Sequence, residues 1–118
     1  MSKLNIRNPE KVPARLVDVA TVLGQNIAAA RKRRRLRQSD VAAMAGTTLP
    51  TIRAVEAGKI GTGIGAYISA LWALGLEDSL LAIATLDSDP EGQVRERAAL
   101  RRGRAQPRMS RKRLDDNF

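Results

Sequence analysis

The sequence predicts an all-α protein in which five helices form one small domain between two flexible arms. Two observations point to this class. Apolar residues recur every three or four positions in several segments, and glycines stand where those segments end. Aromatic residues make up only 3% of the 118 residues, so the core must consist of Ala, Leu, Ile and Val, which suits closely packed helices. We expect a flexible arm over residues 1–15, a helical domain over residues 16–86 and a basic, largely disordered tail over residues 87–118.

The first two predicted helices differ in length. The first begins near Leu16 and carries an inward stripe of Leu16, Ala20, Leu23, Ile27 and Ala30. Gly24 interrupts this pattern with a residue of low helix propensity, so we expect the helix to start or bend there. The second helix is short, Gln38 to Ala45, and Gly46 ends it.

Three further helices are expected over residues 48–57, 64–74 and 78–86. Thr48 is a suitable N-cap for the first of them, and Pro50 fits its first turn, where a missing N–H is harmless. Gly58 and Gly75 end the third and fourth helices, and Thr62 is the expected cap of the fourth. The predicted inward residues are Ile52 and Val55, then Ile64, Ile68, Leu71 and Leu74, and finally Leu80, Leu81, Ile83 and Leu86.

Positive charge is concentrated in two runs of a chain whose net charge is +9. Six Lys or Arg lie in residues 31–37 and nine in residues 95–113, whereas residues 38–94 hold only Arg53 and Lys59 against seven acids. Two separate basic runs favour a nucleic-acid partner, although a basic tail can also serve only solubility. We expect the tail to be mobile until it meets a partner, with a short helix over residues 91–102 as the alternative.

The absence of His and Cys removes the usual zinc ligands and the usual activated nucleophiles. We therefore expect no enzyme, no metal and no cofactor. No run of about 20 apolar residues is present, so we expect no membrane span, and the N-terminus has no signal-peptide pattern. These features predict a cytoplasmic protein, associated with the nucleoid when it is bound to DNA.

The segment Arg37 to Lys59, RQSDVAAMAGTTLPTIRAVEAGK, resembles the helix-turn-helix of the phage repressor and Cro family, the XRE-type regulators. Gln38, Ala42, Gly46, Ile52, Val55 and the Glu56-x-Gly58 ending carry the resemblance, together with LGQNIAAARKRR (23–34) and SALWALGLE (69–77). The resemblance implies a five-helix fold of the lambda-repressor type and a sequence-specific transcriptional repressor. In this arrangement the helix after the Gly turn enters the major groove of DNA.

The side chains that packing leaves free define the predicted DNA contacts. Arg53 suits a guanine edge, whereas Leu49, Pro50 and Ala54 suit a thymine methyl group. Gln38 is predicted to bind a phosphate or a base at the start of its helix. The full predicted set is Gln38, Ser39, Thr48, Leu49, Pro50, Thr51, Arg53 and Lys59, with Lys32, Arg35 and Arg37 as backbone contacts. Three alternatives stay open, namely that Thr48 only caps its helix, that Leu49 is buried and that Arg53 is a plain surface charge.

Arg31 and Glu56 are predicted to form a partly buried ion pair. The resemblance implies this pair, because matching positions in the family join the first helix to the end of the third. Arg31 would then be structural, while its basic neighbours face DNA or solvent.

Partners follow from the size of the module and from the tail. One such module contacts little DNA, so we expect a homodimer on a palindromic operator in double-stranded DNA. The fifth helix and Trp72 are candidates for the dimer contact, unless they complete the monomer core. The tail from Leu86 to Phe118 resembles that of HipB-like antitoxins, which implies autoregulation of an operon and binding to a HipA-like serine/threonine kinase. The alternative is a non-specific DNA- or RNA-binding protein that uses its Arg-rich tail.

Overall fold

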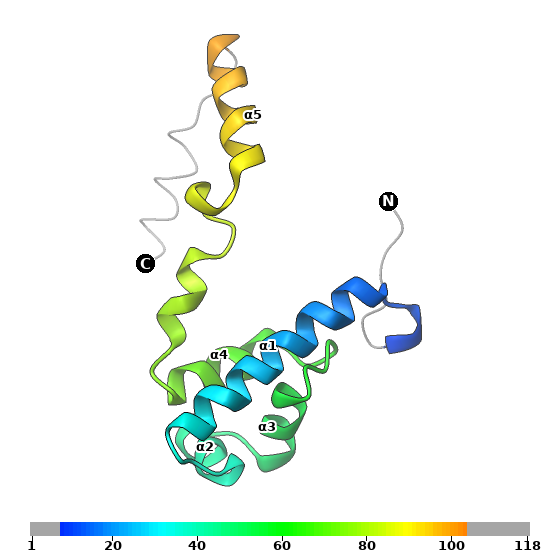
Figure 1. Cartoon of the computed structure of the whole chain (residues 1–118), viewed down its shortest axis with the longest axis vertical. Coiled ribbons are helices and arrows are strands. Elements are labelled where there is room, and N and C mark those ends of the chain that lie inside the picture. The colour runs from blue at the N-terminus through cyan, green and yellow to red at the C-terminus, as the bar shows by residue number, and fades with distance from the viewer. Residues whose placement is uncertain (1–7, 104–118) are drawn as a thin grey trace. The chain divides into compact units, whose positions relative to one another are not determined.

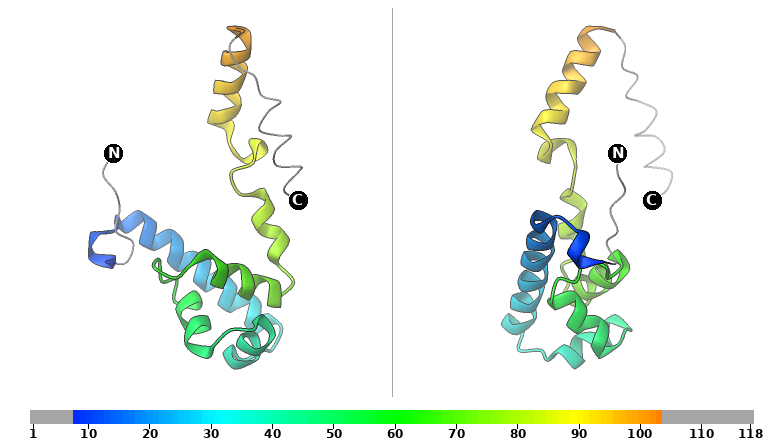
Figure 2. Two further views of the ribbon diagram at one scale, coloured as in Figure 1. Left: turned by 180° about the vertical axis from the view of Figure 1, so that it is seen from behind. Right: turned by 90° about the vertical axis from the view of Figure 1, so that its right-hand side faces the viewer.

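The computed structural model describes residues 8–103, and within that range the chain is helical and contains no strand. The all-α class is therefore confirmed. The described residues divide into two compact units, with the boundary between Asp78 and Ser79. Figures 1 and 2 show the elements of each unit in three orientations.

The first unit contains four α-helices, of which the first is much the longest. They are α1 (Ala14–Arg33), α2 (Gln38–Ala45), α3 (Leu49–Glu56) and α4 (Ile64–Ala73). The arm predicted for residues 1–15 contains a short 3-10 helix, η1 (Pro9–Lys11), and the first residues of α1. Val12, between them, is buried, so this part of the arm is packed, whereas residues 1–7 lie outside the described range.

The core of the first unit lies where α2 and α3 meet the second half of α1 and one face of α4. α2 packs against α3 and α4, and α3 also contacts α1 and α4. Ile52 and Val55 are fully buried, as predicted. The remaining buried apolar residues of these helices are Ile27, Ala30, Val41, Ala42, Tyr67, Ala70, Leu71 and Leu74. These small and branched side chains allow the short helices to approach closely.

The predicted apolar stripe of α1 is wrong for its first half. Ile27 and Ala30 are buried, but Leu16 and Leu23 are each 37% exposed and Ala20 is half-buried. Figure 1 shows the reason, because the N-terminal half of α1 extends beyond the cluster formed by α2, α3 and α4. A start of the helix at Gly24 is also wrong, since α1 runs continuously from Ala14 to Arg33.

The predicted inward face of α4 is likewise half wrong. Leu71 and Leu74 are buried, but Ile64 and Ile68 are exposed, and Tyr67 and Ala70 take their places in the core. Periodicity could not decide between these faces, because nearly every residue of α4 is apolar.

The turns between the helices follow the glycines. Gly46 ends α2 in the left-handed conformation, with φ of 68°, and leaves only two residues before α3 begins. Gly58, also at φ of 68°, follows α3. The predicted cap Thr62 is wrong, because Gly63 occupies the N-cap position of α4 and provides no side-chain hydrogen bond.

The fifth helix predicted for residues 78–86 is absent as an α-helix. Two 3-10 helices stand there, η2 (Glu77–Ala82) and η3 (Leu86–Ser88), and neither holds a buried residue. Ala84 between them adopts a left-handed conformation with φ of 60°. The hydroxyl groups of Thr85 and Ser88 donate to the carbonyl of Ala82 at 3.1 and 2.9 Å, so local turns replace the helical bonds.

The second unit also contains a regular helix, α5 (Pro90–Arg101), where a largely disordered tail was expected. The alternative of a short helix is the one that the structure contains. Asp89 caps it by accepting from the backbone N–H of Gly92 at 3.0 Å, and Arg95 pairs with Glu91 one turn away at 2.6 Å. Local bonds thus form α5 although it buries no residue. Residues 104–118 of the predicted tail lie outside the described range.

Candidate nucleic-acid interface

The start of α3 is held by two threonine hydroxyl groups. Thr48 Oγ1 accepts from the backbone N–H of Thr51 at 3.3 Å, and the two Oγ1 atoms lie 2.9 Å apart. Thr48 is therefore the N-cap of α3, which is one of the two roles predicted for it. Because each hydroxyl has one donor and two acceptor sites and Thr48 stays exposed, capping leaves room for a second hydrogen bond.

The two faces of α3 differ completely. Ile52 and Val55 are buried on one face, whereas Pro50 and Arg53 are exposed on the other. Leu49, Thr51 and Ala54 are partly exposed at the edges, so Leu49 is neither buried nor fully open. We call Thr48, Leu49, Pro50, Thr51 and Arg53 the outer face of α3. It combines apolar groups, hydroxyls and a single guanidinium.

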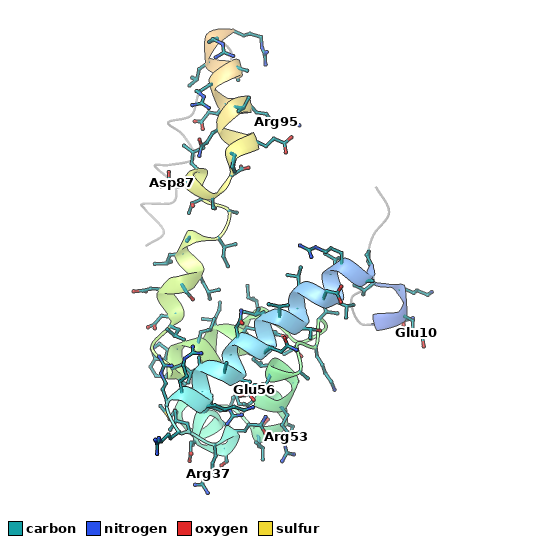
Figure 3. All side chains as sticks on the ribbon, in the orientation of Figure 1. Glu10, Arg37, Arg53, Glu56, Asp87 and Arg95 are labelled. Atoms are coloured by element: carbon teal, nitrogen blue, oxygen red, sulfur yellow. The ribbon has the colours of Figure 1, made fainter. Side chains whose placement is uncertain are left out.

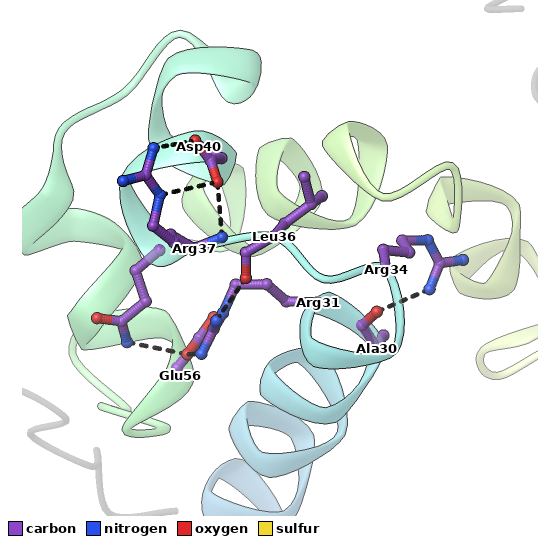
Figure 4. Close-up of polar contacts among 8 residues, drawn as sticks. Ala30, Arg31, Arg34, Leu36, Arg37, Asp40 and Glu56 are labelled. Carbon is purple, nitrogen blue, oxygen red and sulfur yellow. Dashed lines mark hydrogen bonds and ion pairs between the residues drawn. The ribbon is translucent and has the colours of Figure 1, made fainter.

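The predicted ion pair between Arg31 and Glu56 is present, and Figure 4 shows its geometry. Arg31 Nε and Nη2 donate to the two carboxylate oxygens of Glu56 at 2.6 and 3.0 Å, and Arg31 Nη1 donates to the carbonyl of Leu36 at 2.8 Å. The side chains are only 11% and 7% exposed. One guanidinium thus joins the end of α1, the connection to α2 and the end of α3.

Gln38 extends this network, because its Nε2 donates to Glu56 Oε1 at 2.9 Å. The amide keeps a second N–H and its oxygen, and the phosphate or base contact of Gln38 stays a prediction. Burial of Glu56 opposes its ionisation, but the hydrogen bonds from Arg31 and Gln38 and the charges of Arg31 and Lys32 outweigh this effect. They hold the pKa of Glu56 below its usual 4.5.

The connection between α1 and α2 presents the first basic run. Lys32 and Arg35 are exposed, and Arg35 stands in the left-handed region with φ of 55°. Arg34 Nη1 donates to the carbonyl of Ala30 at 2.8 Å, which helps to end α1. These side chains come from the last turn of α1 and the turn that follows it.

Arg37 serves both the helix start and the surface. Its backbone N–H donates to Asp40 Oδ2 at 2.7 Å, and its guanidinium lies 3.4 Å from Asp40 Oδ1. The backbone hydrogen bond, aided by the guanidinium, lowers the pKa of Asp40. The side chain of Arg37 is 82% exposed, and in the view of Figure 3 Arg37 and Arg53 both point away from the body of the first unit, toward the bottom.

The other two predicted contacts, Ser39 and Lys59, are exposed as well. Ser39 lies in the first turn of α2, and Lys59 follows Gly58 after α3. Tyr67 fixes the loop that holds Lys59, because its hydroxyl donates to the carbonyl of Lys59 at 2.9 Å, and burial raises the pKa of Tyr67. The exposed predicted residues therefore come from α2, α3 and the segments beside them. Three predicted residues also make contacts within the chain, since Gln38 bonds Glu56, Arg37 bonds Asp40 and Thr48 caps α3.

Two supporting contacts were not foreseen. The Arg37–Asp40 contact could have been found from the spacing of an acidic residue three positions into a helix. The bond from Tyr67 to Lys59 has no signal in the sequence, since it depends on how α4 returns past the end of α3.

The described residues contain no cluster of three metal-ligating side chains, and no helix among them is long and apolar enough to cross a membrane. No protein-family model, no curated protein and no solved structure matches this chain.

Proposed function

We propose that this chain is a sequence-specific DNA-binding transcriptional repressor whose α3 enters the major groove as the second helix of a helix-turn-helix. The observation that carries the proposal is the pairing of α2 and α3 across the Gly46 turn. Three residues, 46–48, separate the helices, and α3 buries Ile52 and Val55 while its outer face stays accessible. The major groove admits one helix of this kind.

The Arg31–Glu56–Gln38 network supports the same proposal, because it holds the far end of α3 against α1 and α2. Base recognition requires that α3 be held rigidly, since contacts to base edges tolerate little movement. In this arrangement Arg53 donates to a guanine, Leu49 and Pro50 contact thymine methyl groups, and Thr48 and Thr51 bind phosphate or base edges.

The exposed cations around the α1–α2 turn support contacts to the DNA backbone. Lys32, Arg35 and Arg37 lie next to the start of α2, and a helix N-terminus itself favours phosphate. Such contacts position a protein on DNA without reading its sequence.

Selection from a library of randomised DNA duplexes, using the full chain, tests the proposal. We expect enrichment of a palindromic site and a preference for it over a scrambled duplex of about 10³ or more. Arg53→Ala should weaken binding to the selected duplex by about 1–3 kcal/mol and weaken binding to the scrambled duplex less. Arg15→Ala, which removes an exposed arginine from the first turn of α1, is the matched control.

One result would contradict this function, and another would contradict the role of Arg53. If no site is enriched, and affinity for any duplex falls by about 10³–10⁵ between 50 and 200 mM salt, the chain is a non-specific binder. If Arg53→Ala weakens both duplexes equally, Arg53 contacts only the backbone. Autoregulation of an operon and a HipA-like kinase partner stay predictions that rest on the resemblance of the tail.

A further inference from the structure

α4 carries more apolar surface than its own unit covers. Residues 60–76 hold no charged side chain, although 28% of the chain is charged. One face of α4 is buried through Tyr67, Ala70 and Leu71. On another face Ile64, Ile68 and Trp72 are 73%, 41% and 58% exposed, and their spacing of four residues aligns them along the helix. We call these three residues the α4 strip.

An open groove continues the α4 strip onto α1. It has a volume of about 350 Å³, and its walls include Leu16, Val19 and Leu23 from α1 and Ile60, Ile64 and Tyr67 from the other side. Ile64 belongs to both the groove and the strip, so they form one apolar surface. A helix that is apolar on all sides is normally covered on all sides.

The chemistry of this surface indicates its occupant. DNA and acidic proteins need cations to hold them, and neither α4 nor the Ile60–Gly63 loop before it provides one. Two copies of a chain with net charge +9 repel each other unless they meet where charge is absent. The uncharged stretch 60–76 meets this condition, and an exposed Trp is typical of the centre of protein interfaces.

We propose that the α4 strip and the adjoining groove bind a second copy of this chain, with the two α4 helices packed antiparallel across a two-fold axis. In such a two-fold contact, if one residue of the first copy contacts a second residue of the other copy, the same pair is also formed with the copies exchanged. Ile68, in the middle of the strip, then lies near the axis, and Ile64 of one copy faces Trp72 of the other. The inference rests on the proposed function in one respect, which is that a repressor of a palindromic site has to be a dimer.

Sedimentation equilibrium of the full chain tests the inference. We expect a dimer, and Ile64→Asp should raise its dissociation constant by about 30-fold or more, because it places a charge at a buried contact on both copies. The comparison variant is Ile83→Asp, which changes the same residue type at a similar exposure of 68% in the 78–86 segment, the other candidate dimer contact in the sequence. Since Trp72 is the only Trp, its emission should shift to longer wavelength on dilution of the parent chain.

A monomeric parent chain would overturn the inference, and so would a dimer that Ile83→Asp dissociates and Ile64→Asp does not. Circular dichroism of both variants shows that any monomer is still folded, which is expected because Ile64 and Ile83 are exposed.

Cysteine cross-linking provides an independent test, because the chain has no Cys of its own. Ile68→Cys should form a disulfide-linked dimer under mild oxidation, whereas Ile83→Cys should not. The outcomes separate this inference from the proposed function. A cross-linked dimer that selects no DNA site would leave the α4 contact intact and remove the function. A monomer that selects a single half-site would do the reverse.

Discussion

Gly24 of α1 and Gly58 after α3 face each other where α1 crosses the end of α3. A Cβ atom on Gly24 would lie 2.7 Å from the backbone nitrogen of Gly58 and 2.6 Å from the carbonyl oxygen of Glu56. A Cβ atom on Gly58 would meet the backbone of Ala20 and Thr21 even more closely. Both glycines are buried. The crossing sets the distance between the two helix backbones, and next to it lies the Glu56 carboxylate that Arg31 binds.

Gly24→Ala should lower the free energy of unfolding by about 1–3 kcal/mol, because the added methyl group meets backbone atoms that cannot rotate away. This loss should appear although Ala is the better helix former by about 1 kcal/mol. Gly65→Ala in α4 is the control, since nothing lies within 4 Å of its Cβ position. Gly65→Ala should raise the free energy of unfolding. Urea unfolding of both variants measures this increase and the decrease expected for Gly24→Ala. Equal effects would show that the crossing is looser than the structure indicates.

Glu56→Ala should destabilise the protein by about 3–5 kcal/mol, because it leaves the guanidinium of Arg31 buried without its carboxylate. Glu91→Ala breaks the other pair that lies 2.6 Å apart, but there the side chains are 75–78% exposed, and the loss should stay below about 1 kcal/mol. Thermal unfolding measures both changes. An unmoved melting temperature for Glu56→Ala would contradict the structural role of the pair.

Acidification should destabilise the protein partly through Glu56. Its pKa in the folded chain lies below the usual 4.5, so its stabilising contribution is complete above that pH and is lost as the pH falls through the folded-state pKa. Glu56→Gln should therefore lose less stability than the parent chain between pH 7 and pH 3, measured by urea unfolding. Asp40 has a lowered pKa for a similar reason, so Asp40→Asn should remove a separate part of the same slope. Identical slopes for the parent and Glu56→Gln would refute the role of Glu56.

Arg35→Gly should separate stability from nucleic-acid binding. Arg35 adopts a left-handed conformation that costs a side-chain-bearing residue about 1–2 kcal/mol, and glycine adopts it freely. We therefore expect equal or greater stability. Because the variant removes one predicted phosphate contact, the slope of log affinity against log salt should become shallower by about 0.9 on every duplex. An unchanged slope would show that Arg35 does not touch the backbone.

Much of the local structure could be predicted because short-range rules decide it. Gly46 ends a helix, Thr48 begins one, and Ile52 and Val55 recur at helical spacing, so the bounds of α2 and α3 and the buried side of α3 follow from nearby residues. The Arg31–Glu56 pair came from a resemblance, and its residues lie 25 positions apart.

The errors arose where competing faces had similar composition or where two distant segments met. Nearly every residue of α4 is apolar, so its spacing alone could not choose between Ile64 and Ile68 on one side and Tyr67 and Ala70 on the other. The Gln38–Glu56 contact at 2.9 Å joins residues 18 positions apart, so nearby residues do not indicate it.

The amino-acid sequence by itself determined the helical class and the short, glycine-ended pair that includes α3, because backbone preferences and capping act over a few residues. Only the tertiary structure decided which sides of α1 and α4 are covered, and that Gly24 is a contact point between backbones instead of a weak place in a helix. The physical reason is that burial depends on which segments, distant in the sequence, pack against each other. Hydrophobic periodicity and helix propensity are local and do not contain that information.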